Sequence, residues 1–420
     1  MKRIETWQLR AQFAAALSHM YGAEVPAYTA LVEVAAEVNR DYIVNHPRAE
    51  RLGSIDRVTA ERHGAIRVGS PRELADVADL FAAFGMYPVG FYDLRVAASP
   101  IPVVSTAFRP VDANELARNP FRVFTSTLAS ADTRFFGPEL RVRIERFLAC
   151  RELFDPKLIA EARRIAADGG ATPELAAWFV DAAVAAFALS REPIDRSWYA
   201  ELTRVSAVAA DIAGVRSTHI NHLTPRVLDI DELYHKMSAR GITMIDAIQG
   251  PPRWAGPQVL LRQTSFRALA ERRRFREPDG SVNDGTLCVR FGEVEARGVA
   301  LTTKGRDRYD AAMAAADQIA ATGMPWQQAA ETVWPQYFPA TDAELAADEL
   351  AYYRDGDPSR PIVYEDFLPR SAAGIFRSNL DSDTHSTSES SDAHYSPQWM
   401  AGVIGRHLHD PFALYEKAAT

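Results

Sequence analysis

Three segments of the sequence carry side chains that could bind one metal ion. The first contains His63, the second contains His219 and His222, and the third contains Glu293 and Glu295. Each segment is predicted to form a β-strand, and two imidazoles with one carboxylate are the ligands of an open non-haem iron site. Zinc and manganese accept similar ligands, so ligand types alone do not identify the metal. The remaining coordination positions could take a 2-oxo acid and O2, which would allow oxidative chemistry.

His222 is favoured over His219 as the ligand of the second segment. The two residues are an odd number of positions apart, so a regular strand would turn their side chains to opposite faces. The segment resembles the start of the metal-binding modules of glyoxalases and extradiol dioxygenases, in which a strand histidine precedes an aspartate that opens a helix. His222 lies seven residues before Asp229, which suits that spacing. His219 is expected to support the ligand or to have a structural role.

The two carboxylates of the third segment are predicted to have different partners. Glu293 and Glu295 are two residues apart, so both can face one cavity. Burying both is costly unless one meets a cation and the other meets an arginine. Arg297 is available to Glu295, whereas Glu293 follows Gly292, where the backbone can approach closely. Glu293 is therefore the expected ligand.

His63 and Arg67 are predicted to face the same cavity. They are four residues apart on one expected strand, so their side chains point to the same side. A metal ligand and a guanidinium in one cavity could hold an anion that also chelates the metal. A single histidine on a strand is more often structural. His63 is therefore interpreted as a metal ligand only because the other two segments also offer ligands.

Composition predicts a soluble, cytoplasmic protein. The chain has 420 residues, 47% of them hydrophobic, and a net charge of -8, which argues against a nucleic-acid partner or an anionic membrane surface. Two cysteines, Cys150 and Cys288, fit a reducing compartment. The N-terminus lacks the apolar stretch of a signal peptide. The most basic run, 271–276, is expected to be a solvated helix face or a turn.

The order of predicted elements indicates an α+β fold in which a βαβββ unit occurs twice. We expect N-terminal helices at 1–50, a first module at 51–131, a helical insert at 132–212, a second module with the metal ligands at 213–300, and C-terminal helices with a pocket-closing segment at 301–420. The two modules would form a curved central sheet around the metal. The polar stretch 381–396 is expected to be a mobile loop.

Within the modules, the pattern predicts strands and helices at specific positions. The first module should contain a strand at 65–68, a helix at 71–85 that begins with the capping sequence Ser70-Pro-Arg-Glu73, and strands at 87–94, 103–108 and 121–128. The second should contain a strand at 218–227, a helix from Asp229 to about 240, and strands at 259–266 and 286–295. Gln263 and Ser371 are candidate pocket residues, although their segments could equally serve packing alone.

The chain resembles the iron-dependent 2-oxoadipate dioxygenase/decarboxylases of bacterial lysine catabolism, also called 2-hydroxyglutarate synthases. The matching stretches are Arg62–Gly69, Pro120–Ser126, His219–Arg226, Leu261–Phe266, Arg290–Glu293 and Ser371–Phe376. The resemblance implies a vicinal-oxygen-chelate core and Fe(II) held by His63, His222 and Glu293. It also implies that Arg67 pairs with the far carboxylate of a 2-oxo dicarboxylic acid.

The sequence departs from the family pattern at two places. The chain is shorter between the strand of Glu293 and Tyr364, and Arg370 stands where a small apolar residue is expected before Ser371. An extra cation at Arg370 could strengthen the binding of a dicarboxylate or change which chain length fits. The preferred 2-oxo acid therefore stays open.

The reaction implied by the resemblance is the conversion of 2-oxoadipate and O2 to 2-hydroxyglutarate and CO2. One alternative is a metal-dependent lyase or isomerase of the same superfamily, which would need no O2. The other is a non-catalytic ligand-binding protein that uses the same fold. A requirement for O2 distinguishes the dioxygenase from the lyase or isomerase. Release of CO2 distinguishes it from the ligand-binding protein.

Overall fold

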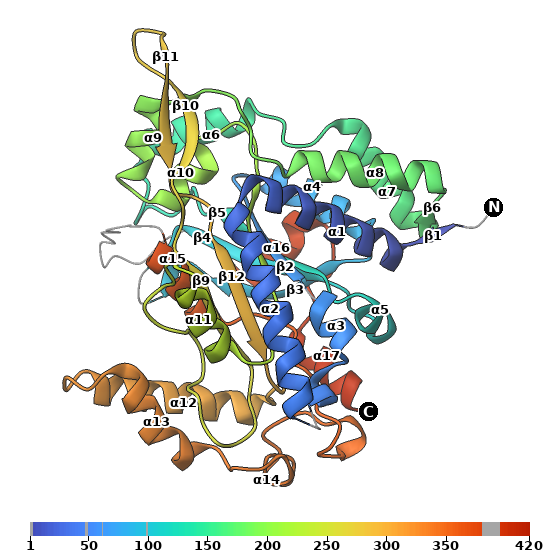
Figure 1. The fold of residues 1–420 in the computed structure, drawn as a ribbon. Helices are drawn as coiled ribbons and strands as arrows, with labels where there is room; N and C mark the ends of the chain where they lie inside the picture. The colour runs from blue at the N-terminus through green and yellow to red at the C-terminus, as the bar shows by residue number, and fades with distance from the viewer. Residues whose placement is uncertain (1–2, 47–48, 61, 98–99, 380–394) are drawn as a thin grey trace.

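A five-stranded sheet runs through the centre of the computed structural model, which describes residues 3–46, 49–60, 62–97, 100–379 and 395–420 (Figure 1). The strand order is β3-β4-β5-β2-β8. The bounds of these strands are Arg62–Val68 for β2, Tyr87–Asp93 for β3, Val103–Arg109 for β4, Arg122–Leu128 for β5 and Ile220–Pro225 for β8.

The first βαβββ module is confirmed. Its elements follow in the order β2, α4 (Pro71–Ala82), β3, β4 and β5, with the short helix α5 (Ala113–Arg118) between the last two strands. The predicted capping box is present at the start of α4. Ser70 Oγ accepts from the backbone N–H of Glu73 at 3.3 Å, and Glu73 Oε2 accepts from the backbone N–H of Ser70 at 3.1 Å.

The second module repeats the strand order of the first. It contains β8, α11 (Ile230–Ala239), β9 (Leu261–Phe266) and β12 (Gly292–Arg297), and β9 pairs antiparallel with β12. The backbone N–H of Val227 donates to the carbonyl of Glu295 at 2.8 Å, which places β12 beside the end of β8. Because β2 also pairs with β8, the strands that carry the candidate ligands His63 and His222 lie next to one another.

One short strand of the second module, the second in chain order, escaped prediction. Met244 bridges to Phe266 and Gln249 bridges to Gln263, so the segment 244–249 lies on the free side of β9. In both modules the first strand is therefore followed in space by the fourth, third and second. The segment makes only isolated bridges, which explains why its sequence lacks a strand pattern.

A β-hairpin interrupts the second module and corrects two predictions. The single strand expected at 286–295 is two strands, β11 (Val282–Leu287) and β12, and β11 pairs with β10 (Glu271–Arg276). The run 271–276 is therefore not a helix face or a turn. Buried Arg273 and Phe275 alternate with exposed arginines, which is the pattern of a strand. The hairpin projects at the top of Figure 1, and β10 also pairs with β7 (Ile194–Asp195).

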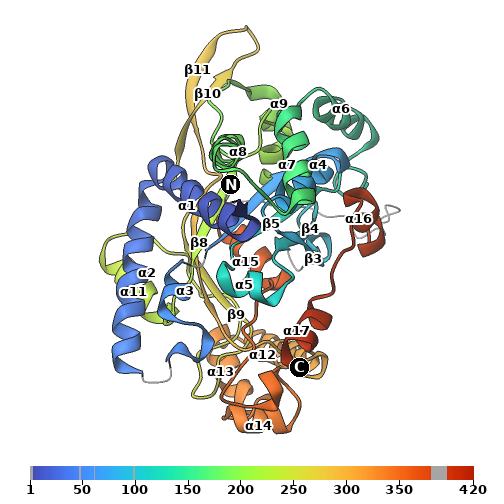
Figure 2. The ribbon, with the colours of Figure 1, turned by 90° about the vertical axis from the view of Figure 1, so that its right-hand side faces the viewer.

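Helices surround the sheet on several sides (Figures 1 and 2). The segment predicted as a helical insert contains α6 to α10, and the division of the chain into five regions stays a prediction. The remaining elements are β1 (Ile4–Glu5), α1 (Thr6–Glu24), α2 (Pro26–Asn45), α3 (Ile55–Ala60), α6 (Pro138–Ala149), α7 (Pro156–Asp168), β6 (Gly170–Ala171), α8 (Pro173–Ala186), α9 (Arg196–Thr203), α10 (Ala207–Ala213), α12 (Thr303–Ala320), α13 (Trp326–Tyr337), α14 (Asp342–Ala347), α15 (Pro369–Asn379), α16 (Pro397–Ile404) and α17 (Pro411–Ala419).

The two faces of β2 belong to different parts of the interior. Ile66 and Val68 pack in one hydrophobic cluster with the N-terminal helices, whereas Ala65 belongs to a second cluster with Phe124. His63 and Arg67 share the face of Ala65, as alternation requires. No helix in the described ranges is long and apolar enough to cross a membrane. The loop predicted at 381–396 lies largely outside the described residues, since 380–394 are not among them.

Replacing Glu73 by alanine is expected to lower the free energy of unfolding by about 3–5 kcal/mol, because Arg151 would stay buried without its carboxylate partner. Glu73 accepts from Arg151 Nε at 2.6 Å and from Nη2 at 2.8 Å. Urea unfolding measures the loss. The control is Glu174→Ala in the exposed first turn of α8, which should cost less than about 1 kcal/mol. Equal losses in both variants would contradict this role of Glu73.

Candidate metal centre

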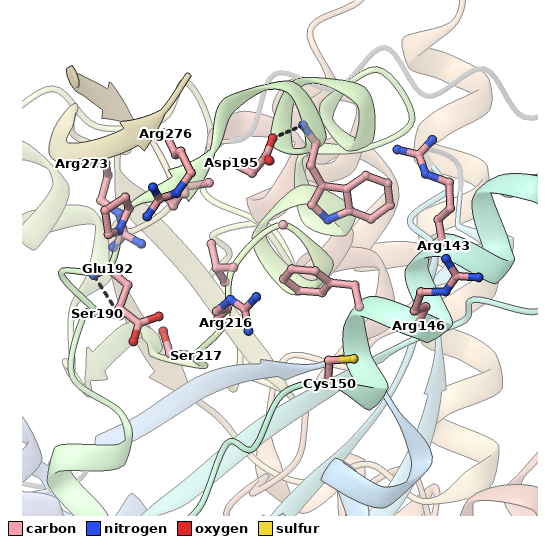
Figure 3. Close-up of a pocket in the computed structure, with 16 residues that line it drawn as sticks. Arg143, Arg146, Cys150, Ser190, Glu192, Asp195, Arg216, Ser217, Arg273 and Arg276 are labelled. Atoms are coloured by element: carbon pink, nitrogen blue, oxygen red, sulfur yellow. Dashed lines mark hydrogen bonds between the residues drawn. The ribbon is translucent and has the colours of Figure 1, made fainter. Parts of the chain in front are cut away.

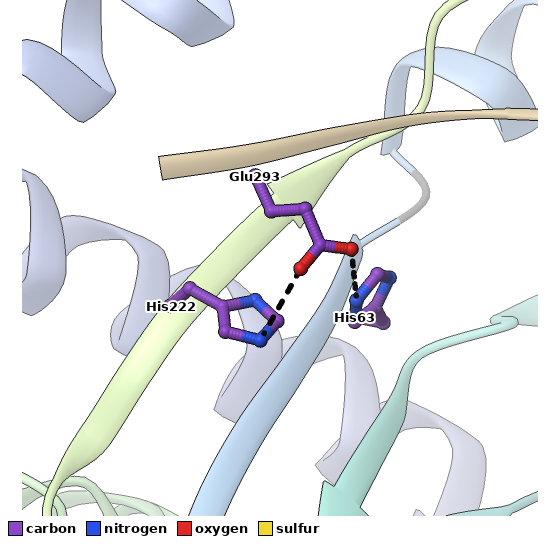
Figure 4. A group of neighbouring side chains, drawn as sticks. All are labelled: His63, His222 and Glu293. Carbon is purple, nitrogen blue, oxygen red and sulfur yellow. Dashed lines mark ion pairs between the residues drawn. The ribbon is translucent and has the colours of Figure 1, made fainter. Parts of the chain in front are cut away.

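Three side chains from three strands meet at one point of the interior (Figure 4). His63 Nε2 lies 3.6 Å from Glu293 Oε1, and His222 Nε2 lies 3.5 Å from Glu293 Oε2. One ligand atom from each residue lies within 4.8 Å of the others, and all three side chains are buried. Metal bonds to such ligands are about 2.0–2.2 Å long, so one divalent ion fits among them with small shifts.

The second nitrogen of His63 is held by a carboxylate. His63 Nδ1 lies 2.9 Å from Glu295 Oε2, and Glu295 accepts from Arg297 Nε at 2.7 Å and Nη2 at 2.8 Å. Burial raises the pKa of Glu295, but Arg297 and His63 outweigh it and hold the pKa well below its usual value. Glu295 therefore stays ionised and forms an ion pair with His63 on the Nδ1 side of the ring, while Nε2 faces Glu293.

The shifted pKa values of Glu293 and His63 indicate that a cation between them would be stabilised. Burial raises the pKa of Glu293 and His63 opposes this, so the carboxylate is costly to ionise without a positive charge beside it. Burial lowers the pKa of His63, but Glu295 and Glu293 outweigh it and raise the pKa above its usual value. A divalent ion would compensate the negative charge of Glu293, as a proton on His63 does when no ion is bound.

His222 is positioned as a neutral imidazole. Its Nδ1 lies 3.0 Å from Thr224 Oγ1, and its ring stacks on Phe291 at 5.1 Å between centroids. Burial, followed by the charges of His63 and Arg67, holds the pKa of His222 well below its usual value. The Nε2 lone pair is then available to a metal ion.

A β-bulge corrects the prediction that His219 and His222 face opposite sides of the sheet. The pairing of β8 with β2 shifts register between His222 and Ile220, so Asn221 is an extra residue. His219, Asn221 and His222 therefore lie on one face, whereas Ile220 packs in the core behind the sheet. Within the described residues, the group of possible metal ligands contains His222 and not His219.

Arg67 is held by a partner that the sequence did not reveal. Its Nη1 lies 2.5 Å from Asp211 Oδ2, and both side chains are buried. Asn221 Nδ2 donates to Asp211 Oδ2 at 3.0 Å, and His219 Nε2 lies 3.5 Å from Asp211 Oδ1. His219 therefore contacts the partner of Arg67, and its support of a metal ligand stays a prediction. Asp211 belongs to α10, 144 positions from Arg67 in the chain, and nothing in its surroundings in the sequence signals this contact.

The pocket at the metal centre is small and largely aromatic. Its volume is about 20 Å³, which suffices for an ion or one water molecule. Gln263, a predicted pocket residue, lines it and donates from Nε2 to Glu293 Oε1. The lining consists of the three candidate ligands, Gln263, three phenylalanines and two residues of α15: His63, His222, Glu293, Gln263, Phe124, Phe291, Phe367, Ala372 and Ile375.

The predicted pocket-closing segment is a helix. α15 contributes the side chains of Ala372 and Ile375, while the backbone N–H of Ala372 is used in a bond to Leu368 O at 3.0 Å. Ser371 is buried at the start of this helix. The prediction that Arg370 contacts the substrate finds no support, because its half-exposed guanidinium pairs with Asp317 through two contacts of 2.6 Å.

Several site residues were missed although the sequence held a signal for one of them. Thr224 follows His222 by two positions on a strand, so alternation could have identified it as a neighbour of the imidazole. Phe124 lies in the recognised stretch Pro120–Ser126 and Phe367 lies four residues before Ser371, but strand patterns do not show which aromatic ring reaches the candidate ligands.

Comparison with known proteins identifies the relatives of this chain. A family profile described as 2-oxoadipate dioxygenase/decarboxylase matches residues 13–379. The chain is 70% identical over 418 residues to the protein of that name from Mycobacterium tuberculosis H37Rv, covering 100% of this chain and 98% of the relative. It is 39% identical over 450 residues to the protein of that name from Pseudomonas putida, covering 98% and 94%.

A solved structure agrees over the full length. The crystal structure of the hydroxyglutarate synthase in complex with 2-oxoadipate from Pseudomonas putida superposes with a TM-score of 0.86 at 36% identity, covering 100% of this chain and 97% of the other. Fold and site together define an α+β chain of two βαβββ modules with a candidate centre for a divalent ion. The chain belongs to the 2-oxoadipate dioxygenase/decarboxylase family, which confirms the resemblance seen in its sequence.

Thr224→Val is expected to weaken the binding of a divalent ion by about 10–100-fold, because the hydroxyl that orients His222 is lost while the volume stays the same. Equilibrium dialysis with Fe(II) under anaerobic conditions measures the affinity. Thr264→Val is the matched control, since Thr264 on β9 is also buried and its hydroxyl has no hydrogen-bond partner in the described part of the chain. An unchanged affinity in Thr224→Val would show that this hydroxyl does not position the ligand.

Proposed function

We propose that this chain catalyses the oxidative decarboxylation and hydroxylation of 2-oxoadipate with O2, giving 2-hydroxyglutarate and CO2. The observation that carries the proposal is the meeting of His63, His222 and Glu293 at one point in a member of this family. A relative with 70% identity bears the name of this activity, and a structural neighbour is described with 2-oxoadipate bound. A place in lysine catabolism rests on the resemblance alone, and a place in the cytoplasm rests on composition and cysteine content.

Fe(II) is the proposed ion. Held by His63, His222 and Glu293, it would supply the redox chemistry by which O2 reacts with a 2-oxo acid. Two imidazoles and one carboxylate suit this ion and leave room for further ligands, although the ligand types fit other divalent metals as well.

The side chains around the ion would hold and orient the substrate. Arg67 is the proposed partner of the far carboxylate, because it shares a face of β2 with His63 and points into the same buried region. An arginine can bind two carboxylates through different edges of its guanidinium, so Asp211 can stay in place when the substrate arrives. Gln263 would fix Glu293, and Ser371 is a proposed side-chain donor to the substrate.

The reaction is balanced without a separate reductant. One 2-oxoadipate and one O2 contain all the atoms of one 2-hydroxyglutarate and one CO2, since the carbon–carbon bond beside the keto group breaks and supplies the electrons. The protein's part is to orient the substrate and to exclude water. Phe124, Phe291 and Phe367 provide the dry wall. Because the pocket holds only about 20 Å³, binding of the substrate requires the wall to move.

The oxygen requirement tests the proposal against a lyase or an isomerase. Iron-loaded protein should release no CO2 from 2-oxoadipate under anaerobic conditions and should consume one O2 for each CO2 in air. An oxygen electrode and a CO2 assay measure both quantities. Turnover without O2 would overturn the proposal, and the absence of CO2 under all conditions would favour a ligand-binding protein.

Arg67→Ala is expected to reduce kcat/KM for 2-oxoadipate by about 100-fold or more, because a buried charge partner of the far carboxylate is removed. The rate with 2-oxohexanoate, which has the same chain length without that carboxylate, should change much less. Arg370→Ala is the control and should leave kcat/KM within about twofold, since Arg370 pairs with Asp317 on the surface. Equal losses with both substrates would assign Arg67 a purely structural role.

A further inference from the structure

A second, larger cavity lies outside the metal centre (Figure 3). Its volume is about 840 Å³, within the range of small-molecule sites. It is bounded by α6 and α9 of the predicted helical insert, by β7 and β10, and by the segment 214–217. No residue lines both this cavity and the metal pocket.

Positive charge dominates the wall of this cavity. Two carboxylates, Glu192 and Asp195, face five arginines: Arg143, Arg146, Arg216, Arg273 and Arg276. Asp195 is the N-cap of α9 and accepts a hydrogen bond from the backbone N–H of Trp198 at 2.8 Å, so its negative charge is partly compensated by the helix. The cavity therefore has a net positive charge although the chain as a whole is acidic.

Three of these arginines are exposed. In the part of the chain that the structure describes, the guanidinium groups of Arg146, Arg216 and Arg276 make no hydrogen bond or ion pair with the protein. Arg143 differs, because it forms two bonds to Glu201 at 2.6 and 2.7 Å and lies 4.7 Å over the Trp198 ring. Most of the cationic groups at this cavity are thus available to a ligand.

Arg273 is the strongest indication of a ligand. It lines the cavity and is only 6% exposed, and its buried Nη1 has no hydrogen-bond partner among the residues that the structure describes. Burial lowers the pKa of Arg273, and the charge of Asp211, the partner of Arg67, opposes this. A buried guanidinium with an unused donor is costly, and an anion in the cavity would satisfy it.

The cavity also offers an apolar surface. Phe147 and Trp198 lie 6.1 Å apart between ring centroids, and Val215 is beside them in the lining. A bare inorganic ion would leave this surface without a contact. A carbon skeleton that carries the anionic groups would cover it.

We propose that this cavity binds a small organic polyanion that carries two or more carboxylate or phosphate groups, with Arg273 as its buried anchor. Arg216 and Arg276 hold the outer anionic group at the mouth, and the skeleton of the ligand packs on Trp198 and Phe147. Arginine suits this role because its planar guanidinium binds carboxylates and phosphates through paired hydrogen bonds.

The two cysteines of the chain provide the test. Cys150 is exposed and lines the cavity, whereas Cys288 is exposed outside the lining. Iron-loaded protein is treated with the neutral reagent iodoacetamide, and the rate at each cysteine is measured by mass spectrometry. Tricarballylate and inorganic phosphate are the probes, and sodium chloride keeps the ionic strength constant. Saturating tricarballylate should slow alkylation of Cys150 at least about threefold and leave Cys288 unchanged, and phosphate should act more weakly.

Variants distinguish the proposed anchor from general electrostatics. Arg273→Gln and Arg216→Gln should each raise the tricarballylate concentration for half-protection about tenfold, because each removes a charged hydrogen-bond donor. Arg204→Gln is the matched control, since Arg204 is exposed near the end of α9 and outside the lining. Arg276→Gln replaces Arg273→Gln as the deciding variant if the latter does not fold. Protection that is equal at both cysteines, or unaffected by the cavity variants, would overturn the proposal.

Discussion

The buried carboxylate of Glu295 is the constraint on which the metal centre depends. It lies between Nδ1 of His63 and the guanidinium of Arg297, so its charge is compensated within the protein. Glu293 is on the same strand but lies against His63, His222 and Gln263 instead of an arginine. One strand thus supplies one carboxylate that orients a ligand and another whose charge is left for a cation.

The pairing of strands in the sheet brings the candidate ligands together. Pairing of β2 with β8 and the contact of β8 with β12 bring ligands from three distant segments together, and each module supplies part of the set. α15 and Phe367 then cover the ion position from outside the sheet. The backbone around Phe367 is fixed by Arg297, which donates to the carbonyls of Tyr364 and Asp366. The same arginine therefore links the orientation of His63 to the wall of the pocket.

The sequence predicted what depends on local pattern and on the cost of buried charge. Alternation identified the strands of the first module, and the need to pair two buried carboxylates separated Glu293 from Glu295 correctly in terms of their contacts. The bulge at Asn221 was not foreseeable, because an extra residue leaves no mark in a strand pattern. The contact between Arg67 and Asp211 joins two regions through tertiary packing, which spacing does not encode.

The central claim is that His63, His222 and Glu293 bind one divalent ion while Glu295 does not. Anomalous diffraction at the iron edge from crystals of Fe(II)-loaded protein tests it most directly. The account predicts a single strong peak about 2.0–2.2 Å from Nε2 of both histidines and from a carboxylate oxygen of Glu293. A peak bound by Glu295, or no peak among these side chains, would contradict it.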